Sequence, residues 1–343
     1  MINFSSENYD HVHPSIMQAM LEANKGFSPS YGKDPDTAKA IEFLKQEFGE
    51  NIQVHFTFNG TGANNFALGC LAQKHHSIFC SDVAHCYVDE FTAPEAFMGC
   101  RLYPVESERG KISVGSLSKH VKRSGDLHHP QPGVVSITQP TEHGTVYSIT
   151  ELQAIKAFCK THNLLLHIDG ARFFNAAVSL GISLRELSTE IGIDALTLGG
   201  TKIGMMFGEA VIFFKPEQSN PFWFMHKRSM QLASKNRFIA IQFTKLFENN
   251  LWMEIANHTN KLANYFEEKV KSIDGVKVVY PVQSNVVFLN LPKWLYLNLR
   301  NHANFYYWDE QKEYARLVFS FSNTKQEVIE FVELLAFSIN LHS

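Results

Sequence analysis

Short apolar runs alternate with amphipathic stretches along the first two thirds of the chain. The apolar runs cover residues 54–58, 77–80, 134–138, 164–168, 194–198 and 210–214, lengths typical of buried strands. Between them, hydrophobic residues recur at helical spacing over residues 37–48, 63–73, 151–162, 171–180 and 183–190. This alternation predicts an α/β large domain with a mainly parallel sheet.

The pattern changes in the last third of the chain. A long helical tract is predicted over residues 231–257, and strands over 276–280, 286–291, 305–308 and 316–321. A final helix is predicted from residue 325 to about 341. We therefore expect two domains: a large domain, residues 1–250, with an N-terminal arm at 1–12, and a small C-terminal α+β domain, residues 251–343.

Composition excludes several classes of protein. The chain has 343 residues, 45% of them hydrophobic, and a formal net charge of −3, so neither a nucleic acid nor another polyanion is predicted as a partner. There is no apolar span of 18 residues and no apolar leader, so no membrane association is predicted. The five cysteines lack close pairs and indicate reduced thiols in a cytoplasmic protein. No zinc signature is present, and no metal is predicted.

Lys202 stands in a turn of small residues, Leu198 to Gly204, between two runs that predict buried strands. Glycines let the backbone or a planar ligand approach closely. A desolvated lysine loses its proton more easily, and the free amine can attack a carbonyl to form a Schiff base. The alternative is an ordinary surface lysine in a loop.

Asp169 follows the apolar run at 164–168, at the end of a predicted parallel strand. Ligands of open α/β sheets bind at that edge. A carboxylate there could keep a pyridine nitrogen protonated, and Arg172, three residues later, could bond a phenolate oxygen. Taken alone, Asp169 and Arg172 could equally be an ion pair at the start of a helix.

Gly60 and Thr61 belong to a glycine-rich turn, residues 59–62, between a predicted strand and a predicted helix. The backbone N–H groups and partial positive charge of a helix N-terminus suit a phosphate. A plain tight turn is the alternative.

These segments closely resemble those of the low-specificity L-threonine aldolases, which are pyridoxal 5'-phosphate (PLP) lyases of the aspartate aminotransferase fold, fold type I. The resemblance continues through residues 4–9, 83–90, 134–139 and 314–318, in the same order along almost the whole chain. It implies the PLP-dependent transferase-like fold for the large domain, PLP as cofactor, and cleavage of L-threonine or L-allo-threonine to glycine and an aldehyde.

The resemblance also implies roles for individual residues. Lys202 would hold PLP and Asp169 its ring nitrogen, while Gly60, Thr61, Arg172 and Arg237 would help bind the cofactor. His85 would stack on the ring and bond the substrate hydroxyl, and His128 would be a second histidine facing the substrate; either histidine, or a water held by them, could be the base. Arg316, Ser6 and Arg172 would bind the substrate. The alternatives are a structural role for His85, a solvated arginine at a strand end for Arg316, and a disordered terminus for the arm that carries Ser6.

Three departures from the family pattern concern the arm and two turns. Glu7 stands where the family usually has Asp, Ile203 replaces an Asn after the lysine, and Ser-Phe-Ser-Asn at 320–323 replaces Ser-Trp-Asp-Thr. The first leaves the geometry of the arm open. The other two could alter the grip on the cofactor or the substrate preference.

An apolar segment at residues 222–225, followed by basic residues that include Arg237, predicts a subunit interface. Proteins of this fold type share active sites between subunits, so we expect a homodimer or homotetramer in which Arg237 reaches the partner's cofactor phosphate. A buried core segment is the alternative. Two other functions stay open: another fold type I PLP enzyme, such as a β-eliminating lyase or an aminotransferase, and a non-catalytic binding protein.

Overall fold

A seven-stranded sheet forms the centre of the larger part of the molecule in this computed structural model, which describes residues 1–215 and 222–341. In spatial order its strands are β2 (Gln53–Thr57), β8 (Glu209–Phe213), β7 (Ala195–Gly199), β6 (Leu165–Gly170), β5 (Gln131–Thr138), β3 (His76–Ser81) and β4 (Arg101–Val105). Only β8 runs antiparallel to its neighbours in this sheet. The predicted α/β class with a mainly parallel sheet is confirmed.

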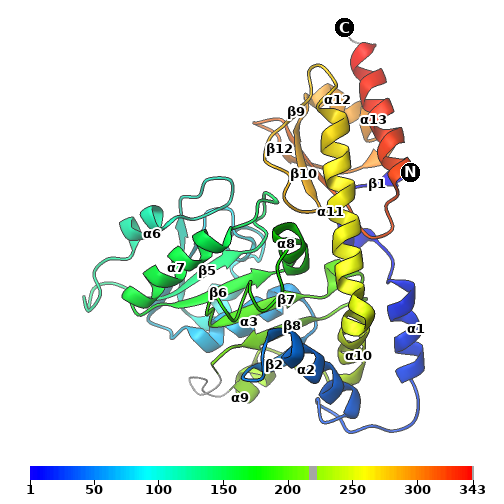
Figure 1. Cartoon of the computed structure of the whole chain (residues 1–343). Coiled ribbons are helices and arrows are strands. Elements are labelled where there is room, and N and C mark those ends of the chain that lie inside the picture. Colours follow the sequence, from blue (N-terminus) through cyan, green and yellow to red (C-terminus); the bar gives the residue numbers. More distant parts are fainter. Residues whose placement is uncertain (216–221, 342–343) are drawn as a thin grey trace.

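Helices cover both faces of this sheet (Figure 1). Successive strand residues point to opposite faces, so Ile212 belongs to one hydrophobic core and its neighbours Val211 and Phe213 to another. The first core also takes residues from α2 (Pro35–Phe48), α7 (Ile149–Thr161), α8 (Phe173–Leu180) and α10 (Arg237–Phe247). The opposite face packs against α3 (Gly60–Leu71) and α5 (Ala93–Met98). The remaining helices here are α1 (Pro14–Ala23), α4 (His85–Val88), α6 (Val114–His120) and α9 (Phe222–Arg228).

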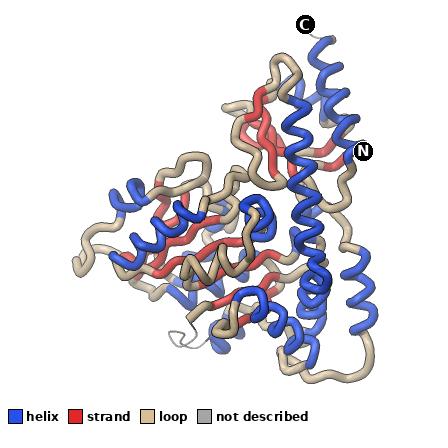
Figure 2. Tube along the Cα trace, viewed as in Figure 1, coloured by secondary structure: helices blue, strands red, loops and turns tan. Residues whose placement is uncertain are grey.

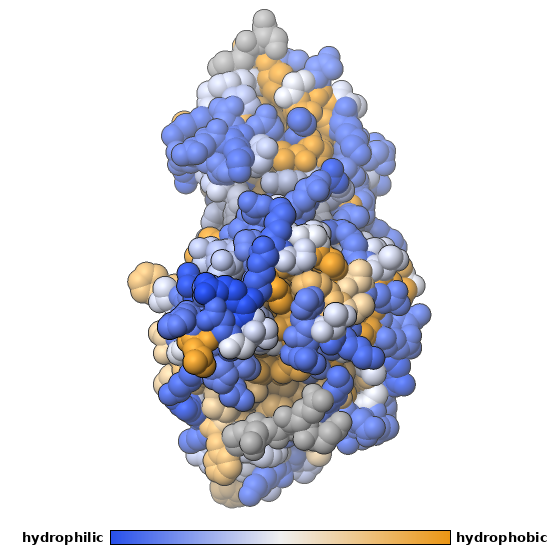
Figure 3. Space-filling model, turned by 90° about the vertical axis from the view of Figure 1, so that its left-hand side faces the viewer, coloured by the Kyte–Doolittle hydropathy of each residue, from blue (hydrophilic) through white to orange (hydrophobic). Residues whose placement is uncertain are grey.

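The C-terminal part has its own antiparallel sheet and its own core. The sheet order is β12 (Tyr306–Asp309), β13 (Tyr314–Val318), β10 (Val286–Asn290) and β9 (Lys277–Val278), and the helices are α11 (Leu251–Val270), α12 (Lys293–Leu299) and α13 (Lys325–Asn340). This part forms the narrower lobe in Figures 2 and 3, and on the face in Figure 3 hydrophobic and hydrophilic residues are intermixed.

The N-terminal arm lies against this C-terminal part. Its first strand, β1 (Ile2–Asn3), pairs in parallel with β11 (Ala303–Asn304), and Phe4 is buried in the C-terminal core. Helix α11 contributes Trp252 to the core of the large sheet and Phe266 to the second core. The domain boundary between residues 250 and 251 stays a prediction.

Several predicted elements differ from the structure. The strand predicted at 316–321 is β13 (Tyr314–Val318), and the helical tract predicted from residue 231 begins only at Arg237. Residues 183–190 form turns, not a helix. The tract at 231–257 is interrupted between α10 and α11, because Asn249 and Asn250 both have φ of 56°, a left-handed conformation that asparagine tolerates. The apolar segment at 222–225 is part of α9, in which Phe222 is buried but Trp223 and Phe224 are exposed. Within the described ranges, no helix is long and apolar enough to cross a membrane.

Candidate active site

A cavity of about 610 Å³ opens at the carboxyl edge of the large sheet and extends to the C-terminal part. Parallel strands present their carboxyl ends at one edge, so residues far apart in sequence meet there. The structure brings most of the predicted residues together in its lining: Ser6, Gly60, Thr61, His85, Asp169, Arg172, Lys202 and Arg316. His128 and Arg237 are not among the described residues that line it.

Lys202 lies in a single 3₁₀ turn, Thr201–Ile203, directly after β7. The two residues before this turn, Gly199 and Gly200, must be glycine. A Cβ on Gly199 would lie 2.3 Å from the carbonyl oxygen of Ala171, and a Cβ on Gly200 would lie 2.4 Å from the carbonyl oxygen of Gly208. Burial lowers the pKa of Lys202, and the positive charge of Arg172 lowers it further. The Lys202 amine is therefore unprotonated more often than the amine of a solvated lysine, and the unprotonated amine is the nucleophile.

Asp169 stands near the end of β6 and is buried. Its Oδ1 accepts a hydrogen bond from the amide of Ala171 at 3.0 Å, and its Oδ2 accepts one from the side chain of Asn64 at 2.8 Å. Two donors on two oxygens hold the carboxylate in one orientation. The group can then offer its remaining lone pairs to a cationic donor in the cavity.

The N-terminus of α3 also faces the cavity, where Asn59, Gly60 and Thr61 line the wall. The Asn59 side chain caps the helix by accepting a bond from the amide of Gly62 at 2.8 Å. Among the described residues, the amides of Gly60 and Thr61 have no hydrogen-bond acceptor. These free donors and the helix dipole suit an anion.

Arg172 is paired with Glu7, an interaction that the sequence did not predict. Its Nε lies 2.6 Å from Glu7 Oε1 and its Nη2 lies 2.9 Å from Oε2, a bidentate pair that is almost fully buried. Burial alone would raise the pKa of Glu7, but the charge and hydrogen bonds of Arg172 lower it to about 2. Asn285 donates a further bond to Glu7 Oε1 at 2.7 Å. The pair connects the N-terminal arm to the strand end that carries Asp169.

Arg316 lies in the middle of β13, not at its start, and has a different environment. Its guanidinium is 4.2 Å from the ring centre of Trp308 and 5.1 Å from that of Tyr306. Its Nε is buried without a hydrogen bond, and among the described residues no carboxylate pairs with it. Burial and the charge of Arg172 lower the pKa of Arg316 to about 10. A cation held by aromatic rings, with its donors free, suits an anionic ligand.

His85 begins the short helix α4, and its ring is about two-fifths exposed. The ring Nδ1 lies 2.9 Å from Oε1 of Glu90, whose side chain is fully buried. The hydrogen bond from His85 to Glu90 raises the pKa of the imidazole, although burial opposes this. The exposed part of the ring is therefore available to a ligand in the cavity.

Two glutamates in the lining, Glu142 and Glu209, were missed in the sequence. Glu142 accepts bonds on Oε1 from the amide of His85 at 2.9 Å and from the hydroxyl of Thr138 at 2.7 Å, and its Oε2 is buried without a partner. Glu209 accepts bonds from the amide of Gly200 and the hydroxyl of Thr201. Burial raises the pKa of each glutamate to about 7.

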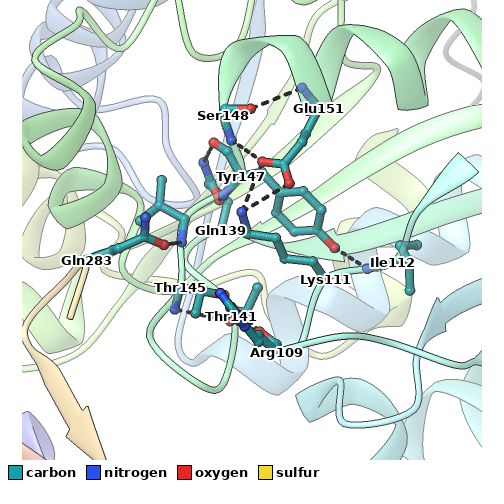
Figure 4. Close-up of polar contacts among 11 residues, drawn as sticks. Arg109, Lys111, Ile112, Gln139, Thr141, Thr145, Tyr147, Ser148, Glu151 and Gln283 are labelled. Atoms are coloured by element: carbon teal, nitrogen blue, oxygen red, sulfur yellow. Dashed lines mark hydrogen bonds and ion pairs between the residues drawn. The ribbon is translucent and has the colours of Figure 1, made fainter. Parts of the chain in front are cut away.

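The loop that carries Glu142 is rigidly braced (Figure 4). The side chain of Gln139 donates to the carbonyl of Tyr147 at 3.0 Å and accepts from its amide at 2.9 Å, which ties the two ends of the loop together. The buried hydroxyl of Tyr147 accepts a bond from the amide of Ile112 at 2.7 Å, and Gln283 of the C-terminal part accepts one from the amide of Val146. These bonds hold the loop in place, and within it the side chain of Glu142 is held by Thr138 and the amide of His85.

The other predicted residues have separate outcomes. The hydroxyl of Ser6 caps the turn that contains Glu7 by accepting a bond from the amide of Asn8 at 3.2 Å. His128 is exposed in a loop, and its backbone amide donates a hydrogen bond to the carboxylate of Asp126. Arg237 begins α10, away from the cavity of its own chain, and donates a bond of 3.4 Å to the carbonyl of Lys25. The roles of all three stay predictions.

Comparison with known proteins gives consistent matches. The sequence profile of the Beta-eliminating lyase family matches residues 3–292. A low specificity L-threonine aldolase of Pseudomonas aeruginosa is 44% identical over 289 residues, which cover 84% of this chain and 84% of that protein. A threonine aldolase structure from Leishmania major has a TM-score of 0.94 at 28% identity, with 100% of both chains covered. A NifS-like protein from Rickettsia africae, with a TM-score of 0.75, 16% identity and 99% of both chains covered, is similar in fold alone.

Proposed function

The chain belongs to the Beta-eliminating lyase family and, within it, to the low-specificity L-threonine aldolases, and from this membership we propose that it is a PLP-dependent lyase that cleaves L-threonine and L-allo-threonine to glycine and an aldehyde. One observation supports this most. A buried lysine, a buried aspartate and an arginine that pairs with no carboxylate of the described residues line a single cavity.

The residues present fit PLP. The Lys202 amine, whose pKa is lowered by burial, suits the cofactor's aldehyde, and the fixed carboxylate of Asp169 suits a protonated ring nitrogen. The free amides of Gly60 and Thr61 suit the phosphate. When bound, the cofactor supplies an electron sink for the bond that breaks at Cα.

The residues of this chain would then orient the substrate and move its proton. The guanidinium of Arg316 would bind the α-carboxylate, with the Ser6 hydroxyl beside it, and this grip would fix the orientation of the Cα–Cβ bond that breaks. His85, His128 or a water held by them would accept the proton of the β-hydroxyl; of the two rings, His85 is the one that lines the cavity among the described residues. As the β-oxygen becomes a carbonyl, the Cα–Cβ bond breaks and the aldehyde leaves. A proton returned to Cα completes glycine.

Product analysis tests the proposal. Purified protein with added PLP should release acetaldehyde and glycine in equal amounts from both threonine isomers. Ammonia with a keto acid in place of glycine would indicate β-elimination, the reaction named by the family profile, and would contradict the aldolase proposal. Absence of any product, with no visible absorption band that borohydride removes, would point to a non-catalytic protein.

Assembly and location belong to the same proposal: a cytoplasmic homodimer or homotetramer with shared active sites. The exposed side chains of Trp223 and Phe224 support an interface, and Arg237, which lies outside its own cavity, would bind the partner's cofactor phosphate. An inactive Lys202→Ala protein mixed with a PLP-depleted Arg237→Ala protein should regain activity when subunits exchange. No recovery after proven exchange would exclude shared sites.

A further inference from the structure

The carboxylate of Glu90 joins two parts of the site that are distant in sequence. Its Oε1 lies 2.9 Å from Nδ1 of His85 and accepts a second bond, also 2.9 Å, from the side-chain amide of Asn64. The other hydrogen of that amide goes to Oδ2 of Asp169 at 2.8 Å. A continuous chain of hydrogen bonds therefore runs from the His85 ring, through Glu90 and Asn64, to Asp169.

The direction of each bond follows from the chemistry of its ends. An ionised carboxylate only accepts, so Nδ1 of His85 must carry the proton that it shares with Glu90. This leaves Nε2 as the ring nitrogen that gains and loses a proton. The side chain of Glu90 is fully buried, so no water competes for the bond to His85.

Asn64 can take only one orientation. If its amide were reversed, its oxygen would face the carboxylates of Glu90 and Asp169, and three acceptors would meet without a donor. In the observed orientation the Oδ1 atom of Asn64 is buried and has no hydrogen-bond partner among residues 1–215 and 222–341. The two bonds to carboxylates outweigh this cost. The Asn64 side-chain amide is therefore oriented to donate to the carboxylates of both Glu90 and Asp169.

We propose that Glu90 is a positioning residue that holds His85 in the Nδ1–H form, reserves Nε2 for proton exchange with the substrate, and connects the ring through Asn64 to Asp169. Three charged groups act on the His85 ring: Glu90 from the segment after α4, Asp169 from β6 and Lys202 from the turn after β7. A fourth charged group, Glu142, accepts a bond from the His85 backbone amide. Of these, Glu90 alone bonds the ring, and its bond is the largest cause that raises the pKa of His85. The role of Glu90 in catalysis rests on the proposed function, but the Nδ1–H tautomer of His85 does not.

The test is ¹⁵N spectroscopy of histidine-labelled protein as a hydrated solid, with and without PLP, over a range of pH. The His85 signals are those absent from His85→Asn. In the wild type, Nδ1 should stay protonated at every pH and Nε2 should lose its proton as pH rises. In Glu90→Gln, which keeps the shape but removes the charge, the titration of His85 should move to lower pH. In Glu90→Ala, the Nδ1–H form should no longer dominate.

Asp89→Asn is the matched control, because it removes a carboxylate one residue earlier that makes no hydrogen bond to the ring among the described residues. An Nε2–H ring in the wild type, or a His85 titration that moves no further in Glu90→Gln than in this control, would overturn the inference. If Glu90→Ala does not fold, the spectra of Glu90→Gln and of the wild type still test whether Glu90 holds the His85 tautomer.

A kinetic measurement completes the test. In Glu90→Gln the acid limb of the kcat/KM profile should move to lower pH, and the plateau should fall by about 10- to 100-fold, the loss expected for one charge-assisted hydrogen bond. A purely structural role would lower the plateau without moving the limb and would contradict the inference. If the protein cleaves no threonine, the proposed function fails, while the ¹⁵N spectra still decide the role of Glu90.

Discussion

Glu7→Gln tests the clearest electrostatic feature of the cavity, the buried pair between Glu7 and Arg172. The substitution keeps the shape of the side chain but removes its charge. Arg172, which is 16% exposed, would then be a nearly buried cation with no described carboxylate bonded to it. Removal of one partner of a buried ion pair is strongly destabilising, because the other charge stays out of water without compensation.

The magnitude follows from the pKa of Glu7. A decrease from 4.5 to about 2 corresponds to about 3 kcal/mol of folding free energy at about 1.4 kcal/mol per pH unit. Because this pKa is lower in the folded state, the contribution is complete above about pH 4.5 and is lost as pH falls towards 2. The wild type and Glu7→Gln should therefore differ by about 3 kcal/mol at pH 7 and converge in acid.

Urea unfolding of PLP-free protein at a fixed concentration, from pH 7 down to about pH 2, gives the free energies over the range in which the difference should disappear. Glu50→Gln, at an exposed position, is the control and should change stability by less than about 0.5 kcal/mol. Arg172→Met should cost about as much as Glu7→Gln, and the double variant should cost clearly less than the two together. Additive losses, or a Glu7→Gln protein as stable as the control, would refute the argument.

Three further substitutions address the chemistry. Lys202→Ala should remove the absorption band that borohydride reduces and nearly all turnover, whereas Lys119→Ala, 65% exposed, should change neither; a wild-type rate in the first would exclude the role of Lys202. Arg316→Leu should raise the KM for threonine by at least about tenfold, and an unchanged KM and kcat would remove Arg316 from the site. Asp169→Asn should lower kcat strongly with PLP still bound, since a neutral amide cannot stabilise a ring cation, and an unaltered kcat would show that Asp169 does not face the ring nitrogen.

The sequence predicted the parts of the site that depend on local pattern. Apolar runs of strand length identified the strand that contains Asp169 and the strand that precedes Lys202, and the parallel sheet explains why these residues meet. The break between α10 and α11 was missed because apolar residues continue at helical spacing on both sides of it. Only the left-handed backbone of Asn249 and Asn250 separates the two helices.

The distant partners of the carboxylates were missed for a different reason. Each carboxylate is defined by a partner that local pattern cannot supply: Glu7 bonds Arg172 165 residues away, Glu142 bonds the amide of His85 57 residues away, and Glu90 bonds Asn64 26 residues away. The sequence does not show which distant residue each of the three will bond. Only the fold decides which charge is buried and what compensates it.

The distribution of these charges explains how the cavity can accept an amino acid carboxylate. Glu7 neutralises Arg172, whereas Arg316 keeps its charge, held by Trp308, so the attraction for an anion is concentrated at the C-terminal wall. Because burial raises the pKa of Glu142 to about 7, this residue is only partly ionised at neutral pH. At higher pH its ionisation adds negative charge to the cavity and weakens the attraction for an anion. The affinity for an amino acid should therefore fall above about pH 7, before Arg316, whose pKa is about 10, loses its proton.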